Sequence, residues 1–265
     1  MFEYEFFRKA LAGILIISIA SALIGTYIFA RRMVAIAGGI THACFGGLGL
    51  GYFLGVSPIV MAGAFAVGSS LGVDWLSTRH RVREDSAIAV VWSFGMAIGV
   101  LFVFLTPGYV PELNSFLFGN ILTISRGDLL AFSVFTGVLM LFIGLNFKKI
   151  VVCAFDRDFA KVSGVNTRLI SAVMTALTAI CIVLTIRLVG VMLLMSMFSL
   201  PQMIAETRFH RVKPLMISSA IVSMLCCLAG LWGACYVDVP CSALIVIVMA
   251  AVFAIVKIVG LIRRR

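Results

Sequence analysis

Hydrophobic residues make up 62% of this 265-residue chain, and charged residues only 12%. These proportions exclude a water-soluble domain, because a folded surface exposed to water needs far more charge. The net charge of +10 does not indicate a nucleic-acid-binding protein, because the basic residues lie between apolar segments rather than in a patch with interleaved aromatic residues. We therefore expect an all-α polytopic membrane protein with a single transmembrane domain over residues 1–265.

Apolar segments of roughly 20 residues can cross the hydrocarbon layer as helices. In chain order they cover residues 10–30, 33–54, 58–77, 86–106, 129–147, 169–187, 188–205, 214–236 and 241–261. The tract 169–205 is too long for one span and short for two, so eight or nine spans are expected. Clusters of Lys and Arg mark the cytoplasmic side, which places the loops 106–126 and 236–240 outside. Counting back along the spans puts the N-terminus outside as well, but Arg8 and Lys9 argue against this, so the side of residues 2–9 stays open.

The second span, residues 33–54, carries His42 near the middle of an otherwise apolar segment. Small residues recur every fourth position beside it and predict a face for close helix packing; they are Gly39, Ala43, Gly47, Gly51 and Gly55. In a second row, Gly38 and Gly46 lie one turn on either side of the imidazole and leave room for water or an ion. Two interpretations of His42 stay open: a hydrogen bond to a neighbouring helix, or a place on a translocation path.

Residues 155–164 predict a short amphipathic helix on the cytoplasmic side. Apolar side chains at i, i+4 and i+7 share one face; they are Phe155, Phe159 and Val162. Asp156 is placed to cap the start of the helix, and Gly164 to end it. Such a helix lies either on the bilayer surface or in a groove of a partner protein. The acidic residues Asp156 and Asp158 favour the partner, because an anionic membrane surface repels them.

Towards the end of the apolar tract, Pro201 removes a backbone donor and predicts a kink or break. The methionines before it are interpreted as packing residues rather than as a thioether metal site.

The seven cysteines form no C-x-x-C pair, so neither a zinc framework nor a thioredoxin motif is expected. Cys235 and Cys241 flank the external turn 236–240, where adjacent helix ends can bring two cysteines within bonding distance.

Four stretches match one family in order and spacing. They are T-H-A-C-F-G-G from Thr41, E-D-S-A-I-A from Glu84, F-D-R-D-F-A-K-V-S-G from Phe155, and V-G-V-M-L-L with S-L-P-Q-M-I-A from Val189. Singly they are weak signals, but four in register are specific. Over nearly its whole length the chain resembles the membrane permease subunit of the ABC importers for zinc, manganese and iron.

This resemblance implies a homodimer in the plasma membrane, two cytoplasmic ATPase subunits and an external binding protein that delivers the metal ion. It implies no permanently bound cofactor. The ATPases would dock on the coupling helix, through the positions Phe155, Asp156, Asp158, Phe159, Ala160 and Gly164.

His42 matches the histidine of the family's second span, and Gly38 stands where the family commonly has an aspartate. Asp158 stands where the coupling motif has glutamate. Water, the dimer mate's His42 or backbone carbonyls near Pro201 would complete the set of metal ligands.

No Walker A sequence occurs, so ATP hydrolysis is expected in another chain and not in this one. A secondary transporter or channel not coupled to ATP is the alternative, but ion-coupled transport would use buried carboxylates, and only Asp74 lies in a span, near its end. The H-E-x-x-H motif of an intramembrane metalloprotease is absent.

Overall fold

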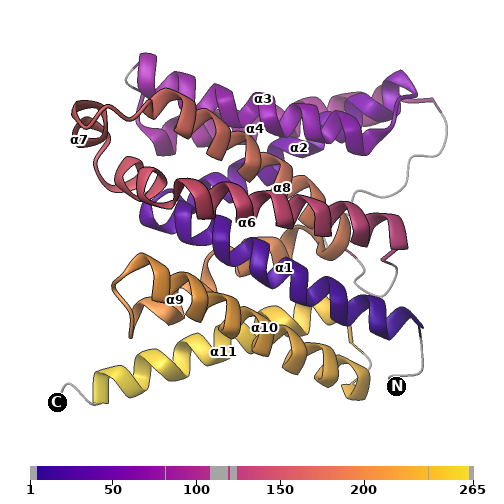
Figure 1. Ribbon diagram of the computed structural model, residues 1–265. Coiled ribbons are helices and arrows are strands. Elements are labelled where there is room, and N and C mark those ends of the chain that lie inside the picture. Colours follow the sequence, from indigo (N-terminus) through magenta and orange to yellow (C-terminus); the bar gives the residue numbers. More distant parts are fainter. Residues whose placement is uncertain (1–4, 81, 108–118, 120–123, 238, 263–265) are drawn as a thin grey trace. The chain divides into compact units, whose positions relative to one another are not determined.

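The computed structural model describes residues 5–80, 82–107, 119, 124–237 and 239–262 (Figure 1). Regular structure in these residues is helical throughout, without strands. The helices are α1 (Glu5–Ala30), α2 (Val34–Leu54), α3 (Pro58–Arg79), α4 (Glu84–Leu105), α6 (Arg126–Phe155), α7 (Arg157–Val162), α8 (Thr167–Met197), α9 (Leu200–Glu206), α10 (Val212–Val237) and α11 (Cys241–Ile262). Eight helical segments of the described chain are long and apolar enough to span a membrane, so the chain is a multi-pass all-α protein as predicted. The external loop predicted over 106–126 lies mostly outside the described residues.

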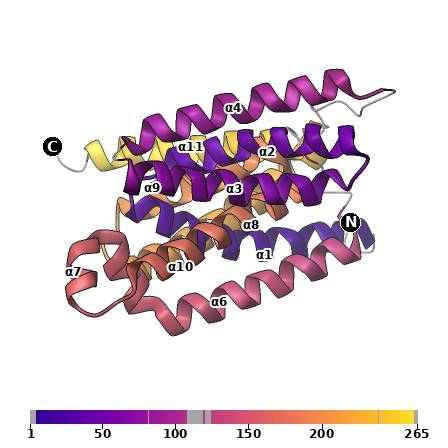
Figure 2. The same cartoon turned by 90° about the horizontal axis from the view of Figure 1, so that it is seen from above.

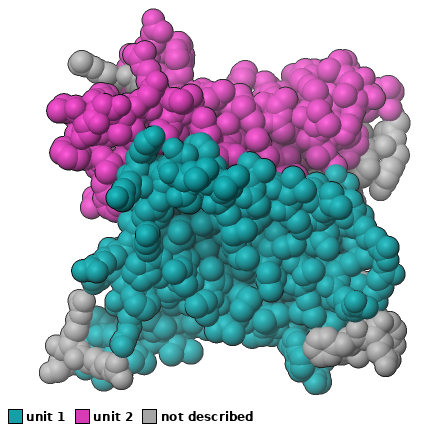
Figure 3. Space-filling view, viewed as in Figure 1, with its two compact units in different colours: residues 1–31, 114–151, 185–265 teal, residues 32–113, 152–184 magenta. Residues whose placement is uncertain are grey.

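Two compact units divide the chain (Figure 3). The chain alternates between them, so that residues 1–31, 114–151 and 185–265 form unit 1, whereas residues 32–113 and 152–184 form unit 2. Neither unit is one continuous stretch. The single domain expected over residues 1–265 stays a prediction.

The core of unit 2 is a bundle of α2, α3 and α4 whose backbones touch on both sides of α2 (Figure 2). On one side, a Cβ added to Gly47 would collide with the carbonyl oxygen of Met61 on α3. On the other, a Cβ added to Gly95 of α4 would lie 2.5 Å from the Cα of Ala43. Close van der Waals packing of this kind is what holds helices together in lipid, and it fixes α2 between its neighbours.

The predicted stripe of packing glycines is correct for three of its four members and wrong for the last. A Cβ added to Gly39 would collide with Ile88, and one added to Gly51 would collide with Pro58, just as one added to Gly47 would collide with Met61. Gly55, by contrast, has φ 65° and forms the left-handed C-cap of α2, and a Cβ there would meet nothing within 4 Å. Its role is to end the helix, because this backbone region favours glycine.

The long apolar tract is interrupted twice, and neither interruption falls at Pro201. Within α8, Gly190 has φ 81° and ψ 172°, which is not helical. The helix then ends at Met197, and α9 starts at Leu200 with Pro201 in its first turn. A proline fits there because the first backbone N–H groups of a helix have no partner within it. The break predicted at Pro201 therefore lies just before this residue.

Contacts within unit 1 show that the chain returns along α6 after this interruption. Nη2 of Arg187 lies 3.0 Å from Oδ1 of Asp128, near the start of α6. Nζ of Lys213 lies 5.2 Å from the ring centroid of Phe147, near the other end. Nineteen residues of helix separate these two contacts, or about 28 Å. Residues 188–212 must cover this distance, so this part of the tract crosses unit 1 from one end to the other. The choice between eight and nine spans stays a prediction.

The start of α1 lies beside the start of α6. Oε1 of Glu5 accepts hydrogen bonds from Nε and Nη2 of Arg126 at 3.1 and 2.6 Å. The Arg126 guanidinium, together with the Lys9 ammonium, lowers the pKa of the Glu5 carboxyl. The starts of α1 and α6 thus share one end of unit 1.

Candidate functional site

His42 lies in the middle of α2 and stacks against an aromatic residue of α4. The centroids of the His42 and Trp92 rings are 4.5 Å apart, and the ring planes differ by 2°. Phe45, on the same helix, contacts the imidazole less closely at 6.1 Å. Nδ1 of His42 is buried and has no hydrogen-bond partner among the residues that the structure describes. The hydrogen bond to a neighbouring helix, one of the two interpretations of this histidine, is therefore not made by Nδ1.

The space expected beside the imidazole is partly filled. A Cβ at Gly46 would lie 2.8 Å from the carbonyl oxygen of Gly95 and 2.8 Å from Cε1 of Phe65. The space beside Gly46 is thus occupied by the backbone of α4 and by the ring of Phe65. The expectation of open room at this position is wrong, because the bundle packs more tightly than one helix alone reveals.

No preformed metal centre surrounds His42. Within the described part of the chain, no group of three or more His, Cys, Asp or Glu side chains could hold a metal ion. One nitrogen ligand among apolar and aromatic side chains can contact an ion but cannot retain it strongly. Such an arrangement suits passage better than storage.

The predicted cytoplasmic helix is present as α7, and local hydrogen bonds define both of its ends. Oδ1 of Asp156 accepts from the backbone N–H groups of Asp158 and Phe159 at 3.0 and 2.9 Å, which makes Asp156 the N-cap. Gly164 follows the helix with φ 76°. The helix itself covers Arg157–Val162 and is shorter than the predicted 155–164, because Phe155 ends α6, Asp156 forms the cap and residues 163–164 form the turn.

The apolar face of α7 is uncovered by the rest of the chain. On α7 it is formed by Phe159 and Val162, which are 60 and 88% exposed, and Phe155, the last residue of α6, is 65% exposed beside it in the sequence. Ala160, on the opposite face, is fully buried. Nζ of Lys161 lies 2.9 Å from Oδ1 of Asp158 and lowers the pKa of that carboxyl, so the acidic charge persists at neutral pH. The helix presents an apolar surface bordered by charge, as a docking element does.

The model of the ABC 3 transport family matches residues 3–260. The chain belongs to this family.

Two of the relatives with similar sequences are named as transport proteins. A probable metal transport system membrane protein of Chlamydia pneumoniae is 34% identical over 88% of this chain and 81% of its own length. A probable iron transport system membrane protein of Haemophilus influenzae is 30% identical over 99% of this chain and 97% of its own length. The solved structure of PsaBC from Streptococcus pneumoniae in complex with Fab has the same fold, with a TM-score of 0.83 at 23% identity, over 96% of this chain and 91% of that one.

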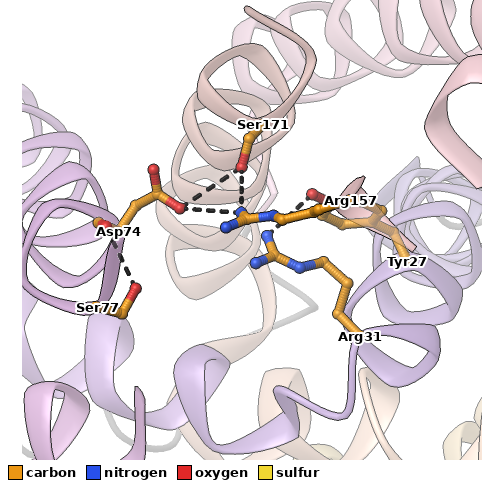
Figure 4. Close-up of polar contacts among 6 residues, drawn as sticks. All are labelled: Tyr27, Arg31, Asp74, Ser77, Arg157 and Ser171. Atoms are coloured by element: carbon orange, nitrogen blue, oxygen red, sulfur yellow. Dashed lines mark hydrogen bonds and ion pairs between the residues drawn. The ribbon is translucent and has the colours of Figure 1, made fainter. Parts of the chain in front are cut away.

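In this ABC 3 family member, α7 is tied to the core of unit 2 by a residue that the sequence analysis did not single out. Nη2 of Arg157 lies 2.8 Å from Oγ of Ser171 on α8 and 3.2 Å from Oδ1 of Asp74 on α3 (Figure 4). Asp74 had been noted only as an acid near the end of a span. An arginine inside the coupling motif and an acid at a span end were the available signals, but their pairing depends on the tertiary fold.

A groove lies between α3 and α4, with a volume of about 410 Å³. Its walls are apolar or small side chains, among them Phe65 and Phe94, and Ser69 supplies a hydroxyl. His42 is not part of its lining.

Cys235 and Cys241, at the facing ends of α10 and α11, are both free. The disulfide considered for this pair is not formed in the structure.

Proposed function

We propose that this chain is the plasma-membrane subunit of an ATP-driven importer of divalent transition metal ions such as zinc, manganese or iron. The observation that carries the proposal is the His42 imidazole, held in the middle of a membrane-spanning helix with Nδ1 unpartnered. An ionisable group inside a membrane segment is retained for a function or for a partner. The relatives named for metal and iron transport support the same class of cargo.

Imidazole fits this cargo chemically. It binds zinc and iron well, accepts manganese, and binds alkali and alkaline-earth ions poorly. With Gly38 one turn away, no carboxylate on α2 strengthens the site. The ion is therefore held weakly and released, with water or the His42 of a second copy as further ligands.

Energy comes from separate subunits in this proposal. The chain lacks a Walker A sequence, and its exposed α7 supplies a surface on which an ATPase docks. We infer a homodimer carrying two ATPases and receiving metal from an external binding protein. The permease itself catalyses no reaction.

The test is metal uptake into vesicles that contain the reconstituted complex. His42→Gln keeps a hydrogen-bonding side chain of similar size but binds transition metals far more weakly than imidazole does. We expect this variant to lose uptake while the complex still assembles. His210→Gln is the matched control, because His210 is exposed outside the helices, and it should transport at the wild-type rate.

Wild-type rates of zinc, manganese and iron uptake by His42→Gln would disprove a role for His42 as a ligand. Uptake by the wild-type complex without ATP would instead favour a transporter or channel not coupled to ATP.

A further inference from the structure

Few contacts hold α7 in place on unit 2. The helix has six residues, which is too short to be stable alone. Its apolar side chains point away from the chain, and Ala160 is the residue that is fully buried. The orientation of α7 therefore depends on its two chain connections and on the polar contacts of Arg157.

Arg157 connects α7 to two further helices at once. Its Nη2 donates to Oγ of Ser171 in the first turns of α8 and to Oδ1 of Asp74 in the last turns of α3. Ser171 Oγ in turn donates to Asp74 Oδ1 at 3.5 Å. The Arg157 and Asp74 side chains are 31 and 28% exposed, so solvent screens this pair less than it screens the ion pairs on the surface.

The pair is the direct link between α7 and α3, which are far apart in the sequence. Beyond Asp74, α3 packs against α2 with its backbone, and a Cβ at Gly51 of α2 would lie 2.6 Å from the Cα of Pro58. Packed helices of this kind shift as units and do not deform continuously. A displacement of α7 that is passed to α3 therefore reaches α2, and with it His42.

We propose that the Arg157–Asp74 ion pair, completed by Ser171, transmits the movement of α7 to the helix bundle that carries His42. Arg157 is a positioning residue in this role, because it acts through Asp74 and not on the transported ion. The inference rests on the proposed function, in which an ATPase docks on α7.

The test measures metal ions imported per ATP hydrolysed, in vesicles that contain the whole complex. Asp74→Asn and Arg157→Gln each remove one charge and leave the apolar face of α7 intact. We expect both variants to retain the ATPase on purification and to hydrolyse ATP, but to import about fivefold fewer ions per ATP or worse, the size of a typical coupling between sites. The double variant should be no worse than either single one, because all three break the same link.

The control is Arg126→Gln, which removes an arginine from another interhelical pair, that with Glu5 in unit 1. Its ratio of import to hydrolysis should stay at the wild-type value. Arg157→Lys keeps the positive charge on α7 and should lower the ratio of import to hydrolysis less than Arg157→Gln does. If the neutral variants are not recovered from membranes, the comparison of Arg157→Lys with the wild type tests the inference: a ratio equal to the wild-type value would contradict a role for the guanidinium contacts.

Three results would overturn the inference: an unchanged ratio in both single variants, additive losses in the double variant, or loss of the ATPase on purification, which would make the pair a support for docking only. In each of these cases the wild-type complex still imports metal. Failure of the wild-type complex to import metal would instead refute the proposed function, and the inference with it.

Discussion

At the scale of single residues, the orientation of His42 is set by Trp92. The near-parallel stack fixes the plane of the imidazole, so that its nitrogens lie at the ring edge, away from the indole face. Nε1 of Trp92 donates to Sδ of Met96 one turn further along α4 at 3.1 Å, which in turn restrains the indole. If His42 is the metal ligand that we propose, its ligand atom is thus positioned by an aromatic contact with another helix.

Replacing Trp92 should therefore reduce transport without abolishing it. An aromatic pair contributes about 0.5–1.5 kcal/mol beyond its buried area, and losing that restraint should lower metal uptake about 2- to 10-fold in Trp92→Leu. Trp92→Phe keeps an aromatic face over the imidazole and should lie closer to the wild type. Initial uptake rates at equal amounts of reconstituted complex provide the measurement. A Trp92→Leu complex as fast as the wild type would show that the stack is dispensable.

At the scale of elements, α7 is formed by local signals, but its apolar side chains Phe159 and Val162 are not covered by the described residues of this chain. The Asp156 cap and the Gly164 turn define its ends, and Ala160 faces the core of unit 2. A short helix with an uncovered apolar face is completed by a partner. Phe159 has the central place on that face, between Phe155 and Val162.

Phe159→Ala should weaken docking of the ATPase by at least about 2 kcal/mol, the cost typical of removing an aromatic residue from the centre of an interface. We expect loss of the ATPase during purification and loss of ATP-driven uptake, while the amount of subunit in the membrane stays normal. Phe104→Ala is the control, because Phe104 is 87% exposed at the end of α4 and lies outside the docking face. Normal co-purification of the ATPase with Phe159→Ala would exclude α7 as the docking helix.

At the scale of the whole molecule, the number of passes decides which loops share a side. The contacts of Arg187 and Lys213 at opposite ends of α6 show that residues 188–212 cross unit 1. We therefore expect nine passes, and an odd number would place the two termini on opposite sides. The clusters of Lys and Arg between the spans would then share the cytoplasmic side. We expect the turn between α10 and α11 on the other, external side.

Thiol labelling tests this topology. Cys235 is exposed and Cys241 is partly so, and the other cysteines are buried; they are Cys44, Cys153, Cys181, Cys226 and Cys227. A membrane-impermeant maleimide should therefore label intact cells through Cys235 and Cys241, without prior reduction, because both are free. The signal should vanish when both are replaced by serine. Lys213 lies at the opposite end of α10. A Lys213→Cys substitution, added to the variant in which Cys235 and Cys241 are serine, should react with the maleimide only after permeabilisation.

Labelling of Cys235 and Cys241 that requires a reductant would show that the disulfide does form. Labelling of Lys213→Cys in intact cells would contradict the orientation.

The sequence by itself determined the features that depend on neighbouring residues. Apolar length alone predicts the spans, since a helix must be about 20 residues long to cross the hydrocarbon layer. The capped and glycine-terminated helix at 156–164 follows equally from side chains within a few positions of one another. The family motifs around His42 and Phe159 are also local strings of residues, and the family they predicted is the one to which the chain belongs.

Only the tertiary structure decided which distant groups meet. Arg157 and Asp74 are 83 positions apart, and their charges identify a pair only once α3 and α7 are adjacent. The spacing of the glycines likewise does not predict that Gly46 packs against the backbone of α4, whereas Gly55 forms the C-cap of α2. A small side chain permits close approach, a left-handed turn and open space alike, and the neighbouring helices determine which of the three occurs.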